Sequence, residues 1–140
     1  MKKIIFILAL SVLSSCGSTK KKEAESLFEV IWEESYGGTK IEFYEIFTEP
    51  SEFKMFLKNP ELKDKVNAKD IETSNFVILN HGERSSGGYS IGVDSVRETS
   101  NNIVIKVKKT APQAGENVTY AFTQPVCIVK INSKKPIVFE

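Results

Sequence analysis

The sequence GERSSGGYSIGV, residues 82–93, follows an apolar run and leads into a strictly alternating one. Its paired glycines, Gly87 and Gly88, would weaken a strand unless the backbone needed them, because glycine loses the most conformational freedom on folding. A phosphate-binding loop would need these glycines to open a helix, whose free N–H groups bind the anion. Here they lead into Tyr89 and an alternating strand instead. We therefore predict a structural turn, in which a positive φ at one or both glycines folds the chain back and places Tyr89 on the core.

The segments on either side of this turn read mainly as short strands. Residues 76–79 are apolar on both faces, as expected of a central strand. The alternation slips between Val93 and Val96, which predicts a β-bulge near Asp94 and Ser95. About eight strands are expected, at residues 28–32, 41–47, 76–79, 89–96, 103–107, 118–122, 126–131 and 137–139.

One segment reads as a helix. Thr48 is a typical N-cap, Pro50 suits the first turn, and Phe53, Phe56 and Leu57 would form the buried face. The following residues, 60–74, are polar and irregular. We predict a mostly antiparallel α+β domain whose sheet is strongly curved or barrel-like, with one short helix.

The amino terminus is typical of a signal sequence. A short positive start precedes an apolar run, residues 4–12, that is too short to span a bilayer. The quartet ending at Cys16, Leu-Ser-Ser-Cys, resembles the lipobox of bacterial lipoproteins, in which the signal is cut before the cysteine and the cysteine carries lipid. An ordinary secretory signal with a chance cysteine is the alternative.

The lipobox resemblance implies three parts: a signal peptide at 1–15, the lipidated Cys16 with a flexible tether to residue 25, and a single domain at 26–140. Residues 17–25 contain no large apolar side chain and cannot pack. The glycine after Cys16 resembles outer-membrane sorting signals. We therefore expect a protein held by its lipid in the bacterial cell envelope, at the outer membrane.

Charge and cysteine content exclude several classes of protein. The chain has 19 basic and 18 acidic residues, and removal of the signal peptide takes away Lys2 and Lys3. Nucleic-acid binding needs a basic surplus on one face, so we expect no nucleic-acid partner. Once Cys16 is acylated, Cys127 is the only other cysteine, and no intrachain disulfide can form.

No catalytic or metal-binding constellation is visible in the sequence. His81 is the only histidine, and no cluster of His, Cys and Asp has ligand spacing. Cys127 shares its predicted face with Val129 and Ile131, which suits an inert core cysteine better than a nucleophile. A serine nucleophile would have to use His81, and no G-x-S-x-G elbow is present. We expect neither enzymatic activity nor a metal or other cofactor.

The turn and two later motifs carry a family resemblance. Residues 82–89, Thr110-Ala111-Pro112 with Gly115, and Thr123-Gln124-Pro125 before an apolar strand resemble the core of the PrcB C-terminal domain family, over roughly residues 75–133. The chain departs from the family at Ser85-Ser86, where proline is frequent, and at Val126, where an aromatic residue is frequent. The family is named for a lipoprotein subunit of a bacterial surface protease complex, so the resemblance implies a non-enzymatic binding or assembly domain.

Two functions are compatible with these observations. The first is a lipid-anchored accessory protein that contacts another secreted or surface protein, with a secreted protease as the partner that the resemblance suggests. The second is a lipoprotein that binds a small ligand in a pocket lined by Trp32, Tyr36, Phe43 and Tyr44, although core packing also explains these aromatics.

For the first function, recognition is expected in two loops, because loops on a rigid sheet commonly carry it. The candidate binding residues are Arg84, Ser85, Ser86, Pro112 and Gln113. Arg84 is the strongest single candidate, since its guanidinium offers several donors to a partner's oxygen atoms. The alternative is that Arg84 pairs within its own domain.

Overall fold

The computed structural model describes residues 26–140. Three predicted features lie outside the described residues: the signal peptide, the lipid attachment at Cys16 and the tether to residue 25. Within residues 26–140, no helix has both the length and the apolar character needed to cross a membrane.

Seven strands and two short helices make up the described part of the chain. In chain order they are β1 (Phe28–Glu34), β2 (Glu42–Phe47), α1 (Pro50–Phe56), α2 (Asp70–Thr73), β3 (Asn75–His81), β4 (Ser90–Glu98), β5 (Ile103–Thr110), β6 (Val126–Ile131) and β7 (Ile137–Phe139). They form a mainly β domain.

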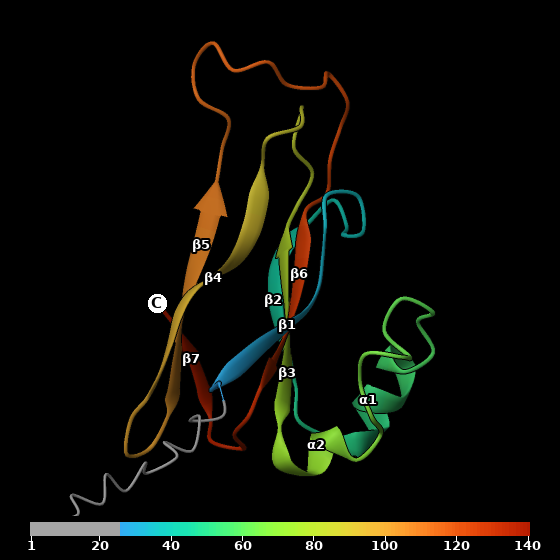
Figure 1. The fold of residues 1–140 in the computed structure, drawn as a ribbon, viewed down its shortest axis with the longest axis vertical. Helices are drawn as coiled ribbons and strands as arrows, with labels where there is room; N and C mark the ends of the chain where they lie inside the picture. Colours follow the sequence, from blue (N-terminus) through green and yellow to red (C-terminus); the bar gives the residue numbers. More distant parts are fainter. Residues whose placement is uncertain (1–25) are drawn as a thin grey trace, which may run out of the picture.

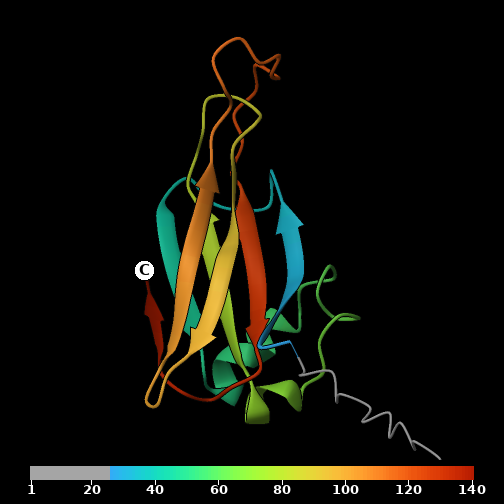
Figure 2. The ribbon, with the colours of Figure 1, turned by 60° about the vertical axis from the view of Figure 1, so that its left-hand side comes forward.

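The strands form two sheets. The first has the order β1-β6-β3-β2 and is antiparallel throughout, and the second has the order β4-β5-β7, in which β7 runs parallel to β5. Figures 1 and 2 show the β4–β5 hairpin stacked on one face of the four-stranded sheet. The two helices lie against the opposite face of that sheet, near its lower end (Figure 1).

Side-chain alternation in the four-stranded sheet explains these layers. Its inner face carries Val77, Leu79, Cys127, Val129 and Ile131, which pack against β4 and β5. Its outer face packs against the helical segment. The outer core contains Ile31, Phe53, Phe56, Leu62, Val66, Ile71, Phe76 and Ile128. Because both faces of β3 are covered, its apolar run is buried almost throughout, as expected of a central strand.

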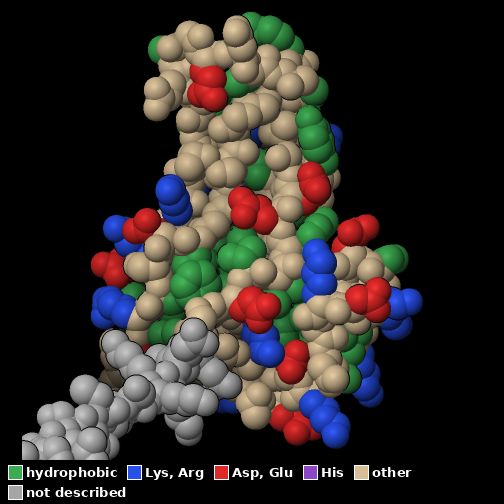
Figure 3. Space-filling model, in the orientation of Figure 1, with side chains coloured by type: hydrophobic (Ala, Val, Ile, Leu, Met, Phe, Trp, Pro, Cys, Tyr) green, Lys and Arg blue, Asp and Glu red, His purple; other side chains and the backbone are tan. Residues whose placement is uncertain are grey.

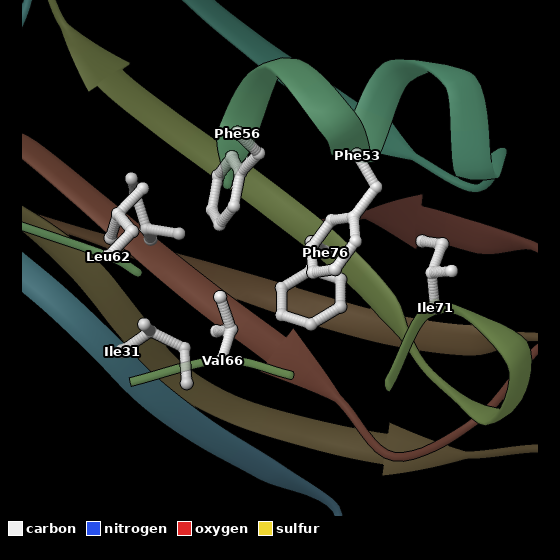
Figure 4. Packing of buried hydrophobic residues seen from close by; sticks show 8 residues of the cluster. Ile31, Phe53, Phe56, Leu62, Val66, Ile71 and Phe76 are labelled. Atoms are coloured by element: carbon white, nitrogen blue, oxygen red, sulfur yellow. The ribbon is translucent and has the colours of Figure 1, made fainter. Parts of the chain in front are cut away.

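Aromatic packing attaches α1 to the sheet. The Phe53 and Phe56 rings lie 4.4 and 5.6 Å from the Phe76 ring, measured between centroids, and Figure 4 shows both reaching down from α1. The N-cap of α1 is Glu49, one residue after the predicted Thr48, and a capping box joins Glu49 to Glu52.

The predicted barrel-like sheet of eight strands is wrong. After the turn at the glycines, β4 stacks over the four-stranded sheet and pairs only with β5, so the sheets stay separate and neither closes. Residues 118–122 are not a strand, because their backbone pairs only locally with the 82–89 loop. The polar segment 60–74 contains α2 and contributes Leu62, Val66 and Ile71 to the outer core.

Register irregularities affect two strands. A shift between Val93 and Ser95 confirms the predicted bulge in β4. A second shift, between Val30 and Trp32, was not predicted. At this shift Ile31 points into the outer core and Val30 stays exposed.

Candidate functional site

Two loops project beyond the ends of the sheets and form a tower. We use the name loop tower for residues 82–89 and 111–125, which rise together at the top of Figure 1. Arg84 and Thr123 exchange two backbone hydrogen bonds of 2.8 and 2.9 Å, and the Gly87 N–H donates to the Thr119 carbonyl at 2.9 Å. The Thr123 hydroxyl donates to the Ser86 carbonyl at 2.9 Å. These bonds hold the two loops as one unit.

Gly88 is the glycine that the tower requires. Its φ is +82°, a left-handed conformation that side chains rarely adopt, whereas Gly87 is not among the glycines with positive φ. A Cβ on Gly88 would lie 2.9 Å from the Pro112 Cβ and 3.1 Å from a Val118 methyl group. The predicted backbone role is therefore present at Gly88. The predicted place of Tyr89 on the core is wrong, because Tyr89 is half-buried and belongs to neither core cluster.

Arg84 makes its polar contacts inside the domain. Its Nη2 donates to the Glu42 carboxylate at 3.0 Å and to the His81 carbonyl at 2.6 Å. Its guanidinium also lies 5.9 Å from the centre of the Tyr89 ring. The structure thus contains the pairing within the domain that was the alternative for Arg84. A direct role of Arg84 in partner binding stays a prediction.

A small charged cluster connects the tower base to both sheets. Glu42 on β2 binds Arg84 and also Lys109 on β5. The hydrogen bond from Lys109 is the largest influence on Glu42 and holds its pKa below the usual value. Burial, followed by the nearby Arg84 charge, lowers the pKa of His81. His81 is therefore neutral near pH 7, and its Nδ1 lies 2.9 Å from Arg84 Nη2 as an acceptor.

Cys127 lies on the inner face of β6 and is fully buried, as predicted from its strand position. Burial raises the pKa of its thiol to about 12, and the Glu33 carboxylate contributes to this shift. The thiol is therefore protonated at neutral pH, which makes it a poor nucleophile. In the described part of the chain, no three His, Cys, Asp or Glu side chains are grouped so that they could hold a metal ion.

The other predicted tower residues differ in their surroundings. Ser85 is exposed, whereas the Ser86 hydroxyl donates to the neighbouring Gly87 carbonyl at 3.0 Å. Pro112 packs against Gly88, and the exposed Gln113 donates its backbone N–H to Glu116 at 2.9 Å. All of them lie in one structural unit, although they come from two distant loops.

Sequence reasoning missed the most exposed aromatic residues of the tower. Tyr120 is 96% exposed and Phe122 is 69% exposed, in the segment that alternation had assigned to a strand. No local signal could have found them, because their alternate spacing is also that of a strand. They stay in solvent because the segment has neither a partner strand in a sheet nor a covering layer. Large exposed aromatics on a braced loop suit contact with another molecule.

A second feature lies on the outer face of the four-stranded sheet. We call it the outer hollow, a cavity of about 440 Å³ between α1 and the β1–β2 loop. Trp32 and Phe43 line it, as the ligand-pocket alternative required. Tyr36 is not part of its lining and is 59% exposed, and Tyr44 lies on the opposite face against Phe139.

The comparison with protein families found a match over part of the chain. Residues 75–132 match the PrcB C-terminal family. The resemblance inferred from the turn motif is therefore confirmed, with almost the same boundaries. The comparison with curated proteins and the comparison with solved structures each found no match.

The PrcB C-terminal segment begins with β3 and ends one residue after β6. It thus contains the two central strands of the larger sheet, the β4–β5 hairpin and the whole loop tower. The charged cluster at the tower base joins this segment to Glu42 of β2, which lies before it. Most residues that line the outer hollow also come before the matched segment, from β1, the β1–β2 loop, β2, α1 and the turn after α1.

Proposed function

We propose that this protein is a non-enzymatic accessory protein, held in the bacterial cell envelope by a lipid on Cys16, that contacts a secreted or surface protease through its loop tower. The observation that carries the proposal is the PrcB C-terminal match, which supports a PrcB-like accessory role. The family is named for a lipoprotein subunit of a bacterial surface protease complex.

The architecture of the tower supports contact by this part of the molecule. Its two loops are braced by backbone hydrogen bonds, so binding would cost little loop-ordering entropy. Tyr120 and Phe122 present aromatic surface that a partner could cover. Aromatic residues of this kind commonly contribute most of the binding energy at protein interfaces.

The amino-terminal sequence supports a location at the membrane. A lipid on Cys16 would leave about ten residues between the membrane and the domain, and a random-coil linker of that length has an r.m.s. reach of roughly 17 Å. The domain would then act on proteins within a few tens of ångströms of the membrane surface. Several acyl chains on one cysteine would make that attachment stable.

Affinity capture tests the contact. The full-length lipoprotein is cross-linked in cells, purified from solubilised envelopes, and its partners are identified by mass spectrometry. We expect a secreted or surface protease, and we expect Tyr120→Ala with Phe122→Ala to reduce its recovery. Val138→Ala, which removes an exposed apolar side chain from β7, is the matched control. Recovery of no protease, or equal recovery by both variants, would refute the proposal.

Membrane fractionation tests the anchor separately. Cys16→Ala should move the protein out of the membrane fraction once cells are lysed, and it should abolish metabolic labelling with fatty acid. A Cys127→Ala variant, in which the second cysteine is removed instead, should keep both properties. Fatty-acid labelling that persists in Cys16→Ala would contradict the lipoprotein assignment.

A further inference from the structure

The outer hollow has the dimensions and composition of a small-molecule site. Its volume of about 440 Å³ lies in the usual range for ligand pockets, which are mostly apolar with a few polar groups. We propose that it binds a small amphipathic amine, with the apolar part on the sheet and the cationic group at the rim. This proposal concerns a surface separate from the loop tower and does not depend on the protease contact.

The hollow exists because the helical layer covers only part of the sheet. At the lower end, the rings of Phe53 and Phe56 pack against Phe76, and all three side chains are buried (Figure 4). Beyond this contact, Ile78 on β3 and Ile128 on β6 are also part of the cavity wall. An apolar sheet surface that is open to a cavity favours an apolar ligand.

The buried side-chain amide of Asn80 fixes the part of the outer hollow that the β1–β2 loop forms. The Asn80 side chain is fully buried and makes hydrogen bonds with Thr39 and with the Ile41 carbonyl. Gly38 packs so closely on it that an added Cβ would lie 2.1 Å from Asn80 Oδ1. A Cβ on Gly37 would lie 2.3 Å from the Trp32 ring. The loop is therefore locked against the sheet, and the pocket needs no rearrangement before a ligand binds.

The charges that line the hollow are all negative. Glu45 on β2 and Glu52 on α1 are its only charged lining residues, and no lysine or arginine contributes to it. Among residues 26–140, no ion pair involves Glu45. One oxygen of Glu52 accepts from the backbone N–H groups of Thr48 and Glu49, at 3.4 Å each. Two carboxylates in the lining of one cavity favour a cation, and the aromatic rings of Trp32 and Phe43 in the same lining can attract it as well.

The fluorescence of Trp32 provides a direct assay, because Trp32 is the only tryptophan in the chain. The full-length chain with Cys16→Ala, which removes the predicted acylation, is titrated with octylamine, octanoate and octanol below their aggregation concentrations. At pH 7 these probes share one tail and differ in head-group charge. We expect saturable changes in Trp32 emission, with octylamine binding tightest and octanoate weakest.

Charge-removing variants test the assignment of the head group. An exposed ionic contact changes affinity by about 1.5- to fivefold. Glu45→Gln should weaken octylamine binding by that factor and leave octanol binding unchanged. Glu61→Gln, which removes an exposed carboxylate outside the hollow, is the matched control and should change neither.

A third variant tests the apolar part. Phe43→Ala should weaken the binding of octylamine and octanol alike, since it removes part of the shared apolar wall. Thermal unfolding of each variant checks that it is folded. Equal affinity for octylamine and octanoate, an unchanged Trp32 spectrum, or equal effects of Glu45→Gln and Glu61→Gln would overturn the proposal.

Discussion

Replacing Gly88 with alanine tests how the loop tower is built. Gly88 combines a positive φ with close packing against Pro112 and Val118, whereas the adjacent Gly87 has neither feature. The variant adds a single methyl group. It therefore probes the backbone conformation and the contact between the two loops at one position.

The expected loss of stability follows from three effects. A left-handed φ costs a non-glycine residue about 1–2 kcal/mol. Overpacking at contacts of 2.9 and 3.1 Å adds roughly 1–3 kcal/mol, because Pro112 and Val118 must shift. Alanine also restricts the unfolded chain, which returns about 0.4–1 kcal/mol. We expect a net destabilisation of roughly 2–4 kcal/mol, or about 8–15 °C in Tm for a domain near this size.

Urea and thermal unfolding, followed by far-UV circular dichroism, measure this loss. Gly87→Ala is the matched control, since its Cβ would lie 3.5 Å from the nearest atom, an ordinary contact. Gly92→Ala on β4, where nothing lies within 4 Å, is a second control. Both should stay within about 1 kcal/mol of the parent. If Gly88→Ala were no less stable than Gly87→Ala, the tower would not depend on Gly88, and our reasoning about this turn would be refuted.

Three further predictions concern buried polar groups. Asn80→Ala should lower the free energy of unfolding by about 2–3 kcal/mol, because the β1–β2 loop loses its buried hydrogen-bond partners. In the same urea titration the control Asn101→Ala, at an exposed position, should have little effect. Equal losses of unfolding free energy in the two variants would contradict this prediction. Cys127 should resist alkylation in the folded protein and react once urea unfolds it. Cys127→Ala should lower the free energy of unfolding by on the order of 1 kcal/mol. Rapid labelling of the folded protein would contradict the burial of this thiol. Burial and the Arg84 charge lower the pKa of His81 in the native state, so the unfolded chain binds the imidazole proton more tightly than the native protein does. The contribution of neutral His81 to stability is therefore complete above the ordinary pKa of 6.5. It decreases as the pH falls toward the native pKa. Urea unfolding at pH 7.5 and 5.5 should therefore show a smaller loss of unfolding free energy between the two pH values for His81→Gln than for the parent. Identical losses would exclude a contribution of His81 to the pH dependence of stability.

Local sequence determined the features that depend on neighbouring residues. The alternation around the bulge in β4, the apolar run of β3 and the helix opening at Pro50 are each encoded within a few residues. The glycine pair likewise signalled a turn, because its backbone requirement is local. The PrcB C-terminal resemblance was readable for the same reason, since its motifs lie in and beside this turn.

Only the tertiary structure decided which strands pair and which surfaces remain open. Alternation in residues 118–122 looks like a strand, but the segment joins the tower, since no sheet edge pairs with it. The ion pair of Arg84 with Glu42, 42 positions earlier in the chain, depends on the packing of β2 beside β3. The outer hollow likewise arises where the helical layer stops short on the sheet. Pairing, packing and uncovered surface all depend on contacts between distant residues, and local periodicity carries no information about them.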